Sequence, residues 1–277
     1  VEIALQRNLP VDELAKQGIL LKRGAGDIVH TNTRCSDKEG SDYELCVIQE
    51  DIVEDVAGFM NPDKLVKRTS NIAFSYMVPA LDAVKAAAIA SQFHVRYATK
   101  ELIDKYQKQN LNVQSLYNVE TASASYVLTG YLNLAGVGVT QTYPVQEIKQ
   151  VQEKDKRDSR PLRQEAAIDA LVLTLTQFLF GAKRTRFNPL VEIEAIVVAI
   201  SEKPFTLPPI NGNVSEYVKL VNSTAESFSS VLGVSKPTIA FYAKGVEGSK
   251  ANPVEVFNTV KSQLKSAGQQ GEKKGKK

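Results

Sequence analysis

The stretch PLRQEAAIDALVLTLTQFLFGAKRTRFNPLVEIEAIVVAIS (161–201) contains both kinds of element on which the fold depends. Its first part predicts a helix over roughly 161–180, because apolar residues recur every three or four positions and so share one face. That face comprises Ile168, Leu171, Val172, Leu175, Phe178 and Leu179. Pro161 suits the first turn and Gly181 suits the C-terminal cap. The last part, 190–201, predicts a strand, so a core-facing helix is followed by a strand across a short basic connector.

Similar patterns continue on both sides of this stretch. Alternating or continuous apolar runs predict strands, and amphipathic or Ala-rich runs predict helices. Strands are expected over 43–53, 71–79, 91–99 and 237–244, with one or two more within 114–139, and helices over 10–17, 80–90, 214–231 and 252–266. Because several strands adjoin without an intervening helix, we expect an α+β fold with helices on one side of a sheet.

Charge is distributed unevenly along the 277 residues. The last 17 residues contain six Lys and one Glu, a charge of +5, which leaves residues 1–260 at about −2 of the total +3. We expect a single domain over 1–260 and a solvated, disordered basic tail over 261–277. A basic cluster within 1–260 is therefore a local feature rather than a sample of a generally basic surface.

Several classes of protein are disfavoured by what the sequence lacks. No run of 18 apolar residues and no secretory signal is seen, so a cytoplasmic protein without a membrane span is expected. P-loop, GxGxxG, HExxH and GxSxG motifs are missing, so no nucleotide, nicotinamide or metal cofactor is expected.

Cys35 and Cys46 favour a reduced intracellular chain without metal, although a single bridge fits a hyperthermophilic source. The acidic run Glu50, Asp51, Glu54 and Asp55 is typical of a solvated face.

The basic connector is the first candidate binding site. Lys183, Arg184 and Arg186 follow the predicted helix and flank Thr185. One or two cations there would stabilise the negative end of the helix dipole by about 0.3–1 kcal/mol. Three cations with a hydroxyl also suit a phosphate clamp, since guanidinium and ammonium groups form charge-assisted hydrogen bonds with phosphate oxygens.

A second candidate repeats almost the same local chemistry. The segment KLVKRTS (64–70) predicts an exposed basic loop or hairpin. Its candidate phosphate contacts are Lys64, Lys67, Arg68, Thr69 and Ser70, and the preceding Phe59 and Met60 offer apolar side chains that could wedge between bases. The competing interpretation is an ordinary solvated turn. Two K-R-T tripeptides in a slightly acidic body favour the binding interpretation.

The third candidate is the polar face of the predicted strand 91–99. Gln92, His94 and Arg96 alternate with apolar residues, so they share one face. His94 suits a general base, but no nucleophile is placed beside it by sequence. Such a face is better suited to contact with a nucleic-acid backbone.

Four segments carry a resemblance to a known family. They are GFMNPDKLVKRTSNIAFSYMVPAL (58–81), SQFHVRYATK (91–100), YNVETASASYVL (117–128) and GAKRTRFNPLVEIEAIVV (181–198). In this order, over roughly 45–200, the sequence resembles the backbone subunit of the archaeal type I-A CRISPR surveillance complex (Cascade), a DevR-like member of the RAMP superfamily. Residues 201–277 carry little of that signature. The family begins with a core strand and a helix that would lie upstream of Val1, and nothing in 1–45 matches them.

The resemblance implies a modified RNA-recognition-motif (ferredoxin-like) core with thumb-like and helical insertions. It also implies a non-catalytic protein that polymerises as a helical filament along one CRISPR RNA. Its partners would be that RNA, copies of itself, other type I-A subunits and, through the guide, target DNA. Two alternatives remain: a metal-independent RAMP endoribonuclease with His94 as acid or base, and a protein whose basic segments organise only protein–protein contacts.

Overall fold

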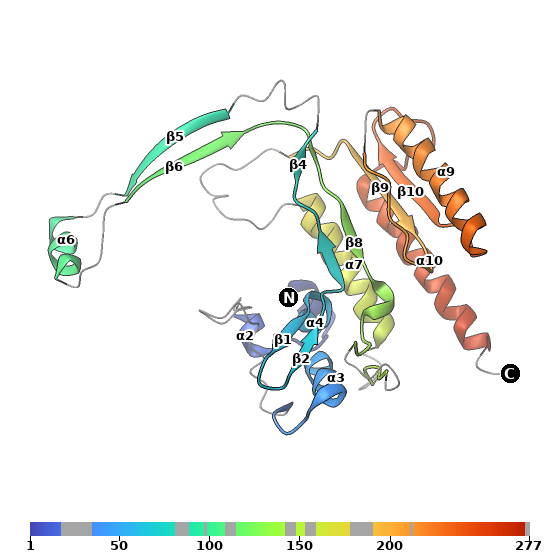
Figure 1. Ribbon diagram of the computed structural model, residues 1–277, viewed down its shortest axis with the longest axis horizontal. Coiled ribbons are helices and arrows are strands. Elements are labelled where there is room, and N and C mark those ends of the chain that lie inside the picture. Colours follow the sequence, from blue (N-terminus) through green and yellow to red (C-terminus); the bar gives the residue numbers. More distant parts are fainter. Residues whose placement is uncertain are drawn as a thin grey trace. The chain divides into compact units, whose positions relative to one another are not determined.

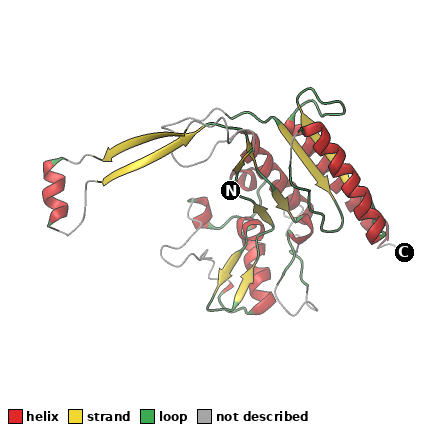
Figure 2. Cartoon of the chain, turned by 45° about the horizontal axis from the view of Figure 1, so that its top comes forward, coloured by secondary structure: helices red, strands yellow, loops and turns green. Residues whose placement is uncertain are grey.

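The computed structural model describes residues 1–17, 35–80, 89–96, 99–108, 115–141, 148–152, 159–177, 191–210 and 213–274 (Figure 1). Helices and antiparallel strands alternate in these segments, as the predicted α+β class requires (Figure 2). The chain forms two compact units: unit 1 is Val1–Ile72 with Leu132–Lys277, and unit 2 is Ala73–Tyr131. The predicted single domain over 1–260 therefore contains two units, with unit 2 inserted in sequence between the two parts of unit 1.

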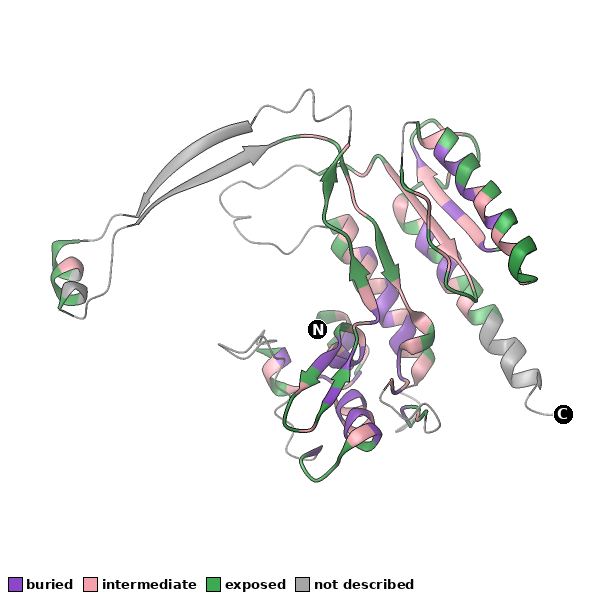
Figure 3. Cartoon of the chain, in the orientation of Figure 1, coloured by how far each residue is buried: buried purple, intermediate pink, exposed green. Residues whose placement is uncertain are grey.

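The N-terminal part of unit 1 is mainly helical. Its elements are α1 (Glu2–Gln6), α2 (Glu13–Lys16), α3 (Gly40–Glu50), α4 (Ile52–Ala57), β1 (Phe59–Asn61) and β2 (Val66–Arg68). Tyr43, Val47 and Ile48 of α3 pack against the β1–β2 hairpin in one apolar cluster. Ile52 of α4 packs with residues of α1, α2 and α7 in a second cluster. Figure 3 shows how the buried residues gather on these elements.

The strand predicted over 43–53 is wrong, because this segment forms the end of α3 and the start of α4. Buried residues of α3 recur four positions apart, Tyr43 with Val47 and Glu44 with Ile48, which is a helical spacing. Asp51 separates the two helices, and its side chain accepts a hydrogen bond of 2.8 Å from the Val53 amide to cap α4.

The expectation of two reduced cysteines is also wrong. Cys35 and Cys46 form a disulfide that joins the segment before α3 to α3 itself. Cys35 is fully buried in the same apolar cluster as Tyr43 and Val47. The bridge therefore lies directly behind the β1–β2 hairpin.

The C-terminal part of unit 1 is a strand ladder covered by helices. Its elements are the 3₁₀ turn η2 (Leu134–Gly136), α7 (Arg160–Gln177), β9 (Ala195–Ile200), α9 (Val214–Leu232), β10 (Thr238–Ala243) and α10 (Pro253–Lys274). β9 and β10 pair antiparallel in the register Ile200 opposite Thr238. Ile168 and Val172 of α7 and Phe257 of α10 form a core against one face of β9. These elements confirm the helices predicted over 161–180, 214–231 and 252–266 and the strands predicted over 190–201 and 237–244.

α10 extends further than the sequence predicted. It continues to Lys274, through most of the segment 261–277 that was expected to be a disordered tail. Two of its lysines are held by α7, since Lys261 pairs with Asp169 and Lys265 with Glu165. These ion pairs stabilise the helical conformation of the first turns of the expected tail.

Unit 2 consists mostly of two-stranded ribbons. Its elements are β3 (Ile72–Phe74), β4 (Val78–Pro79), β5 (Ile89–Arg96), α6 (Lys100–Gln107), β6 (Ser115–Ala122), β7 (Tyr126–Val127) and β8 (Gly130–Leu132), with the unit boundary falling inside β3 and β8. β3 pairs with β8, β4 with β7 and β5 with β6. The helix predicted over 80–90 falls largely outside the described residues.

In the part of the chain that the structure describes, all strands lie in separate two-stranded ladders. The predicted antiparallel sheet with helices on one side is therefore not seen as one continuous sheet in these residues. An RNA-recognition-motif core remains a prediction.

Candidate nucleic-acid interface

The β1–β2 hairpin carries most of the second candidate site. Phe59 lies opposite Arg68, and Met60 lies opposite Lys67. Because side chains alternate along a strand, Phe59 and Arg68 share the inner face, while Met60 and Lys67 share the outer face. The burial follows this division: Arg68 is 2% exposed, whereas Met60 is 45% exposed and Lys67 is also exposed.

The turn of the hairpin extends this outer face. Lys64 is half-buried, and Leu65 is 91% exposed with a backbone φ of +53°. The turn is fixed from within, since the Asn61 side chain donates to the Tyr43 hydroxyl over 2.8 Å and accepts from the Lys64 amide. Burial raises the pKa of the Tyr43 phenol above its ordinary value. The outer face thus presents the ammonium group of Lys67 beside the apolar side chain of Met60 on a hydrogen-bonded hairpin.

Arg68 does not belong to this outer face, which corrects its prediction as a phosphate contact. Its Nη1 donates to Glu44 Oε1 over 2.7 Å, and its Nη2 donates to Asp55 Oδ1 over 2.6 Å. The remaining donors reach backbone carbonyls of Asp55, Gly136 and Val139. With its guanidinium so engaged and buried, Arg68 holds the hairpin to α3 and α4 rather than facing a ligand.

A second arginine completes this buried charge network. Arg163 of α7 donates from Nη1 to Asp55 Oδ2 over 3.2 Å. The carboxylates also accept backbone hydrogen bonds, Glu44 from the Gln141 amide and Asp55 from the Gly138 amide. Two guanidinium groups therefore balance two carboxylates, with backbone amides satisfying the remaining lone pairs, as a buried ion cluster requires.

Asp51, Glu54 and Asp55 are likewise buried, so the solvated acidic face expected over 50–55 is wrong for these three.

Three other predicted contact residues, in or next to the hairpin, are likewise either engaged within the fold or exposed to solvent. Phe59 is 5% exposed and lies edge-on to Tyr43 with ring centroids 6.3 Å apart, so it is a core residue and not a wedge between bases. The Ser70 hydroxyl donates within the loop to the carbonyls of Val56 and Ile72. Thr69 is exposed, and its amide donates to the Gln141 side chain over 3.1 Å. Met60, Lys64, Lys67 and Thr69 thus remain candidate contacts.

The third candidate lies in unit 2, on strand β5. Its pairing with β6 places Gln92 opposite Val119, His94 opposite Tyr117 and Arg96 opposite Ser115. The strand predicted over 91–99 is therefore confirmed, and the three polar residues occupy alternate positions on it. Their roles in binding remain predictions.

The first candidate, Lys183, Arg184, Thr185 and Arg186, lies outside the described residues. The structure therefore adds nothing to the phosphate clamp predicted there. The same holds for Gly181 as the cap of α7.

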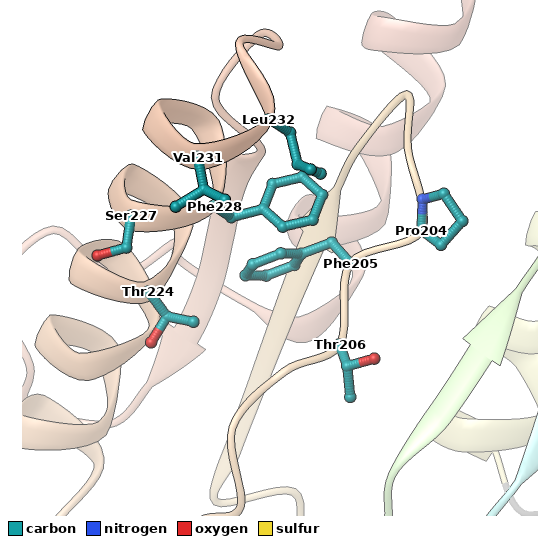
Figure 4. A pocket seen from close by; sticks show the side chains of 8 residues that line it. All are labelled: Pro204, Phe205, Thr206, Thr224, Ser227, Phe228, Val231 and Leu232. Carbon is teal, nitrogen blue, oxygen red and sulfur yellow. The ribbon is translucent and has the colours of Figure 1, made fainter.

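An apolar groove on unit 1 is a surface that the sequence did not predict (Figure 4). It has a volume of about 490 Å³ and lies between the end of α9 and the loop after β9. Phe205 and Phe228 meet edge-on in it with ring centroids 5.1 Å apart. The full lining is Pro204, Phe205, Thr206, Thr224, Ser227, Phe228, Val231 and Leu232. Every lining residue is uncharged, so the groove offers no cation to a phosphate.

The described residues contain neither a metal-binding cluster nor a membrane-spanning helix. No group of three or more His, Cys, Asp or Glu side chains is arranged to hold a metal ion. No helix in the described segments is both long and apolar enough to span a membrane.

The chain is an α+β protein with a candidate surface for binding a polyanion. That surface is the exposed face formed by Met60 and Lys67 on the β1–β2 hairpin. The chain belongs to the DevR/Csa2 family of CRISPR-associated proteins. A family model described as CRISPR-associated negative auto-regulator DevR/Csa2 matches residues 1–222. This match confirms the family resemblance found in the sequence, and it extends the resemblance beyond the expected range of about 45–200 to residues 1–222.

Three similar proteins support the same assignment. The chain is 64% identical over 260 residues to CRISPR-associated protein Cas7/Csa2 1 of Saccharolobus solfataricus, covering 94% of this chain and 78% of that protein. It is 30% identical over 224 residues to CRISPR-associated aCascade subunit Cas7/Csa2 2 of the same organism, covering 79% and 65%. It is 27% identical over 202 residues to CRISPR-associated protein Cas7/Cst2/DevR of Methanocaldococcus jannaschii, covering 70% and 61%.

Proposed function

We propose that this protein is a non-catalytic, CRISPR-RNA-binding backbone subunit of a type I-A interference complex. In this role, copies of the chain polymerise along one CRISPR RNA beside other subunits of the complex and present the guide for pairing with target DNA. Membership of the DevR/Csa2 family carries the proposal, together with the name of the aCascade subunit among its relatives.

The outer face of the hairpin suits the chemistry that this function needs. A guide RNA has an arbitrary sequence, so a subunit that coats it must bind phosphate and sugar rather than read base edges. Lys67, with Lys64 and Thr69 close in sequence, supplies ammonium and hydroxyl groups for phosphate oxygens. Exposed Met60 adds an apolar surface beside Lys67. Such contacts bind all sequences alike.

The predicted contacts Gln92, His94, Arg96, Lys183, Arg184, Thr185 and Arg186 extend the proposal. A single RNA strand that runs over several cations loses affinity with rising salt, by a slope of about 0.7 per phosphate neutralised. Each cation removed should therefore weaken binding and flatten this slope.

Two sets of substitutions test the proposal by measuring RNA affinity over a series of salt concentrations. We expect Lys67→Ala to lower the slope by about 0.7 and the triple variant Lys183→Ala/Arg184→Ala/Arg186→Ala by about 2. Lys236→Ala is a matched control, since Lys236 is a surface lysine paired with Glu226 and remote in sequence from the candidate sites. Wild-type affinity and slope in both test variants would contradict the proposal. Electron microscopy of the protein with RNA should reveal a regular helical filament that is lost after RNase treatment.

The endoribonuclease alternative predicts a different result with the same material. Repeat RNA incubated in chelator should remain intact with a non-catalytic subunit. Discrete cleavage products that disappear in His94→Ala would replace the proposed function with RNA processing. Filaments that persist without RNA would instead favour a protein that organises only protein–protein contacts.

A further inference from the structure

The ribbon formed by β3, β4, β7 and β8 in unit 2 exposes an unusual number of large apolar side chains. Tyr76 is 91% exposed, and five others are about half exposed. These five are Phe74, Met77, Val78, Tyr126 and Tyr131. The exposed colouring runs along much of β4 and β8 in Figure 3. Four of the six are aromatic, and their surface needs a partner, because soluble proteins seldom leave such patches uncovered.

The backbone of this ribbon is firmly hydrogen-bonded on both sides of Tyr76. On one side, the Ser75 amide donates to the Thr129 carbonyl over 2.8 Å, and the Thr129 amide donates to the Ser75 hydroxyl over 3.0 Å. On the other side, the Ala80 amide donates to the Ser125 carbonyl over 2.9 Å. Tyr76 therefore projects from a fixed ribbon and not from a loose loop.

Gly130 explains how an aromatic ring lies on this ribbon. A Cβ atom at Gly130 would come within 2.8 Å of the Phe74 ring. The absence of a side chain therefore allows the ring of Phe74 to lie directly against the backbone of β8. The ring is held in place by the ribbon and stays about half exposed.

The charge of the ribbon decides what kind of partner it suits. Residues 73–80 and 125–132 contain no Asp, Glu, Lys or Arg. The ribbon therefore offers no cation for phosphate, and the proposed phosphate contacts Lys64 and Lys67 lie outside it. In a single strand of RNA the uncharged parts are the bases, whose faces stack on aromatic side chains whatever the sequence.

We propose that Phe74 and Tyr76, two positions apart along one edge of the ribbon, form a stacking platform for unpaired nucleobases of single-stranded RNA. The platform rests on the proposed RNA-binding function and adds to it the contacts made with the bases. Stacking is tolerant of sequence, so it suits a guide RNA of arbitrary sequence.

Substitutions at Tyr76 separate stacking from phosphate binding. Alanine substitution of a stacking residue weakens binding by about 5- to 150-fold. We therefore expect Tyr76→Ala to weaken the binding of single-stranded RNA within that range with an unchanged salt slope, and Tyr76→Phe to restore affinity. Lys67→Ala should lower the slope instead. Val231→Ala is the matched control, because Val231 is also a highly exposed apolar residue. Thermal unfolding should be the same for all four variants.

The chain contains no Trp, so Tyr76→Trp introduces a single fluorophore at the platform. Single-stranded oligouridine and oligoadenosine should quench its emission in parallel with binding, and polyphosphate of similar charge should not. Unquenched emission with wild-type affinity in Tyr76→Ala would overturn the platform while leaving RNA binding through Lys67 intact. No RNA binding by the wild-type protein would overturn both proposals. Loss of self-association without RNA in Tyr76→Ala, with RNA affinity unchanged, would make the ribbon a protein interface and also overturn the platform.

Discussion

Lys67 and Arg68 are consecutive in the sequence but lie on opposite faces of β2. Lys67 faces outward, whereas the Arg68 guanidinium is buried with Nη1 2.7 Å from Glu44 Oε1 and Nη2 2.6 Å from Asp55 Oδ1. The alternation of a β-strand thus assigns one cation to the surface and the other to the core. Two neighbouring positive charges therefore have different physical roles.

Arg68→Ala is expected to destabilise the fold strongly. Removal of one partner from a buried ion cluster leaves its carboxylates without compensation, which costs about 3–5 kcal/mol. Lys67→Ala should change the free energy of unfolding by at most about 0.5 kcal/mol, as is usual for exposed positions. Chemical denaturation followed by circular dichroism measures both. Equal effects of the two substitutions would contradict the assignment of Arg68 to the core.

The sequence predicted an exposed basic loop or hairpin over 64–70, but it did not distinguish the roles of the two neighbouring cations. Chemistry alone makes Lys67 and Arg68 equivalent phosphate ligands. Their separation depends on Glu44 and Asp55, which lie 24 and 13 residues away in sequence. Contacts of that kind are set by tertiary packing, and a local pattern does not contain them.

The strand predicted over 43–53 was wrong for a different reason. Its β-branched and aromatic residues favour a strand, but propensity is a weak guide that tertiary context overrides. The spacing of Tyr43, Val47 and Ile48 already fitted one helix face. The longer helices α7, α9 and α10 were predicted correctly, because several turns of periodic apolar residues give a stronger signal than one strand-length run.

Reduction of the Cys35–Cys46 bridge is expected to lower stability. The two cysteines are 11 residues apart, and closure of a loop of about this length contributes roughly 3 kcal/mol by restricting the unfolded chain. Unfolding transitions with and without reductant measure the difference. A thiol assay under denaturing, non-reducing conditions should find no free thiol. The control is the double variant Cys35→Ala/Cys46→Ala, whose transition should not respond to reductant.

Gly58→Ala is expected to destabilise the fold by about 3 kcal/mol or more. Gly58 ends α4 with φ +78° and ψ 169°, a conformation essentially restricted to glycine. An added Cβ would also lie 2.6 Å from the Arg68 carbonyl oxygen and 2.7 Å from the Ser70 amide, both backbone atoms. Gly233→Ala is a matched control, since it too has positive φ but no atom within 4 Å of its Cβ position. That control should lose only about 1–2 kcal/mol, and similar losses at both positions would contradict the close packing at Gly58.

Leu65→Gly is expected to stabilise the fold by about 0.5–1 kcal/mol while weakening RNA binding. Leu65 adopts a left-handed conformation that costs an L-residue about 1–2 kcal/mol, and glycine relieves this at a smaller entropic cost. Its side chain is 91% exposed, so little packing is lost. A strained, exposed leucine at the tip of an anchored hairpin fits a role in binding, since strain persists where function uses it. Denaturation and RNA titration on the same sample test both halves. A loss of more than about 1 kcal/mol would mean that Leu65 packs within the isolated chain, and unchanged RNA affinity would exclude its side chain from the proposed interface.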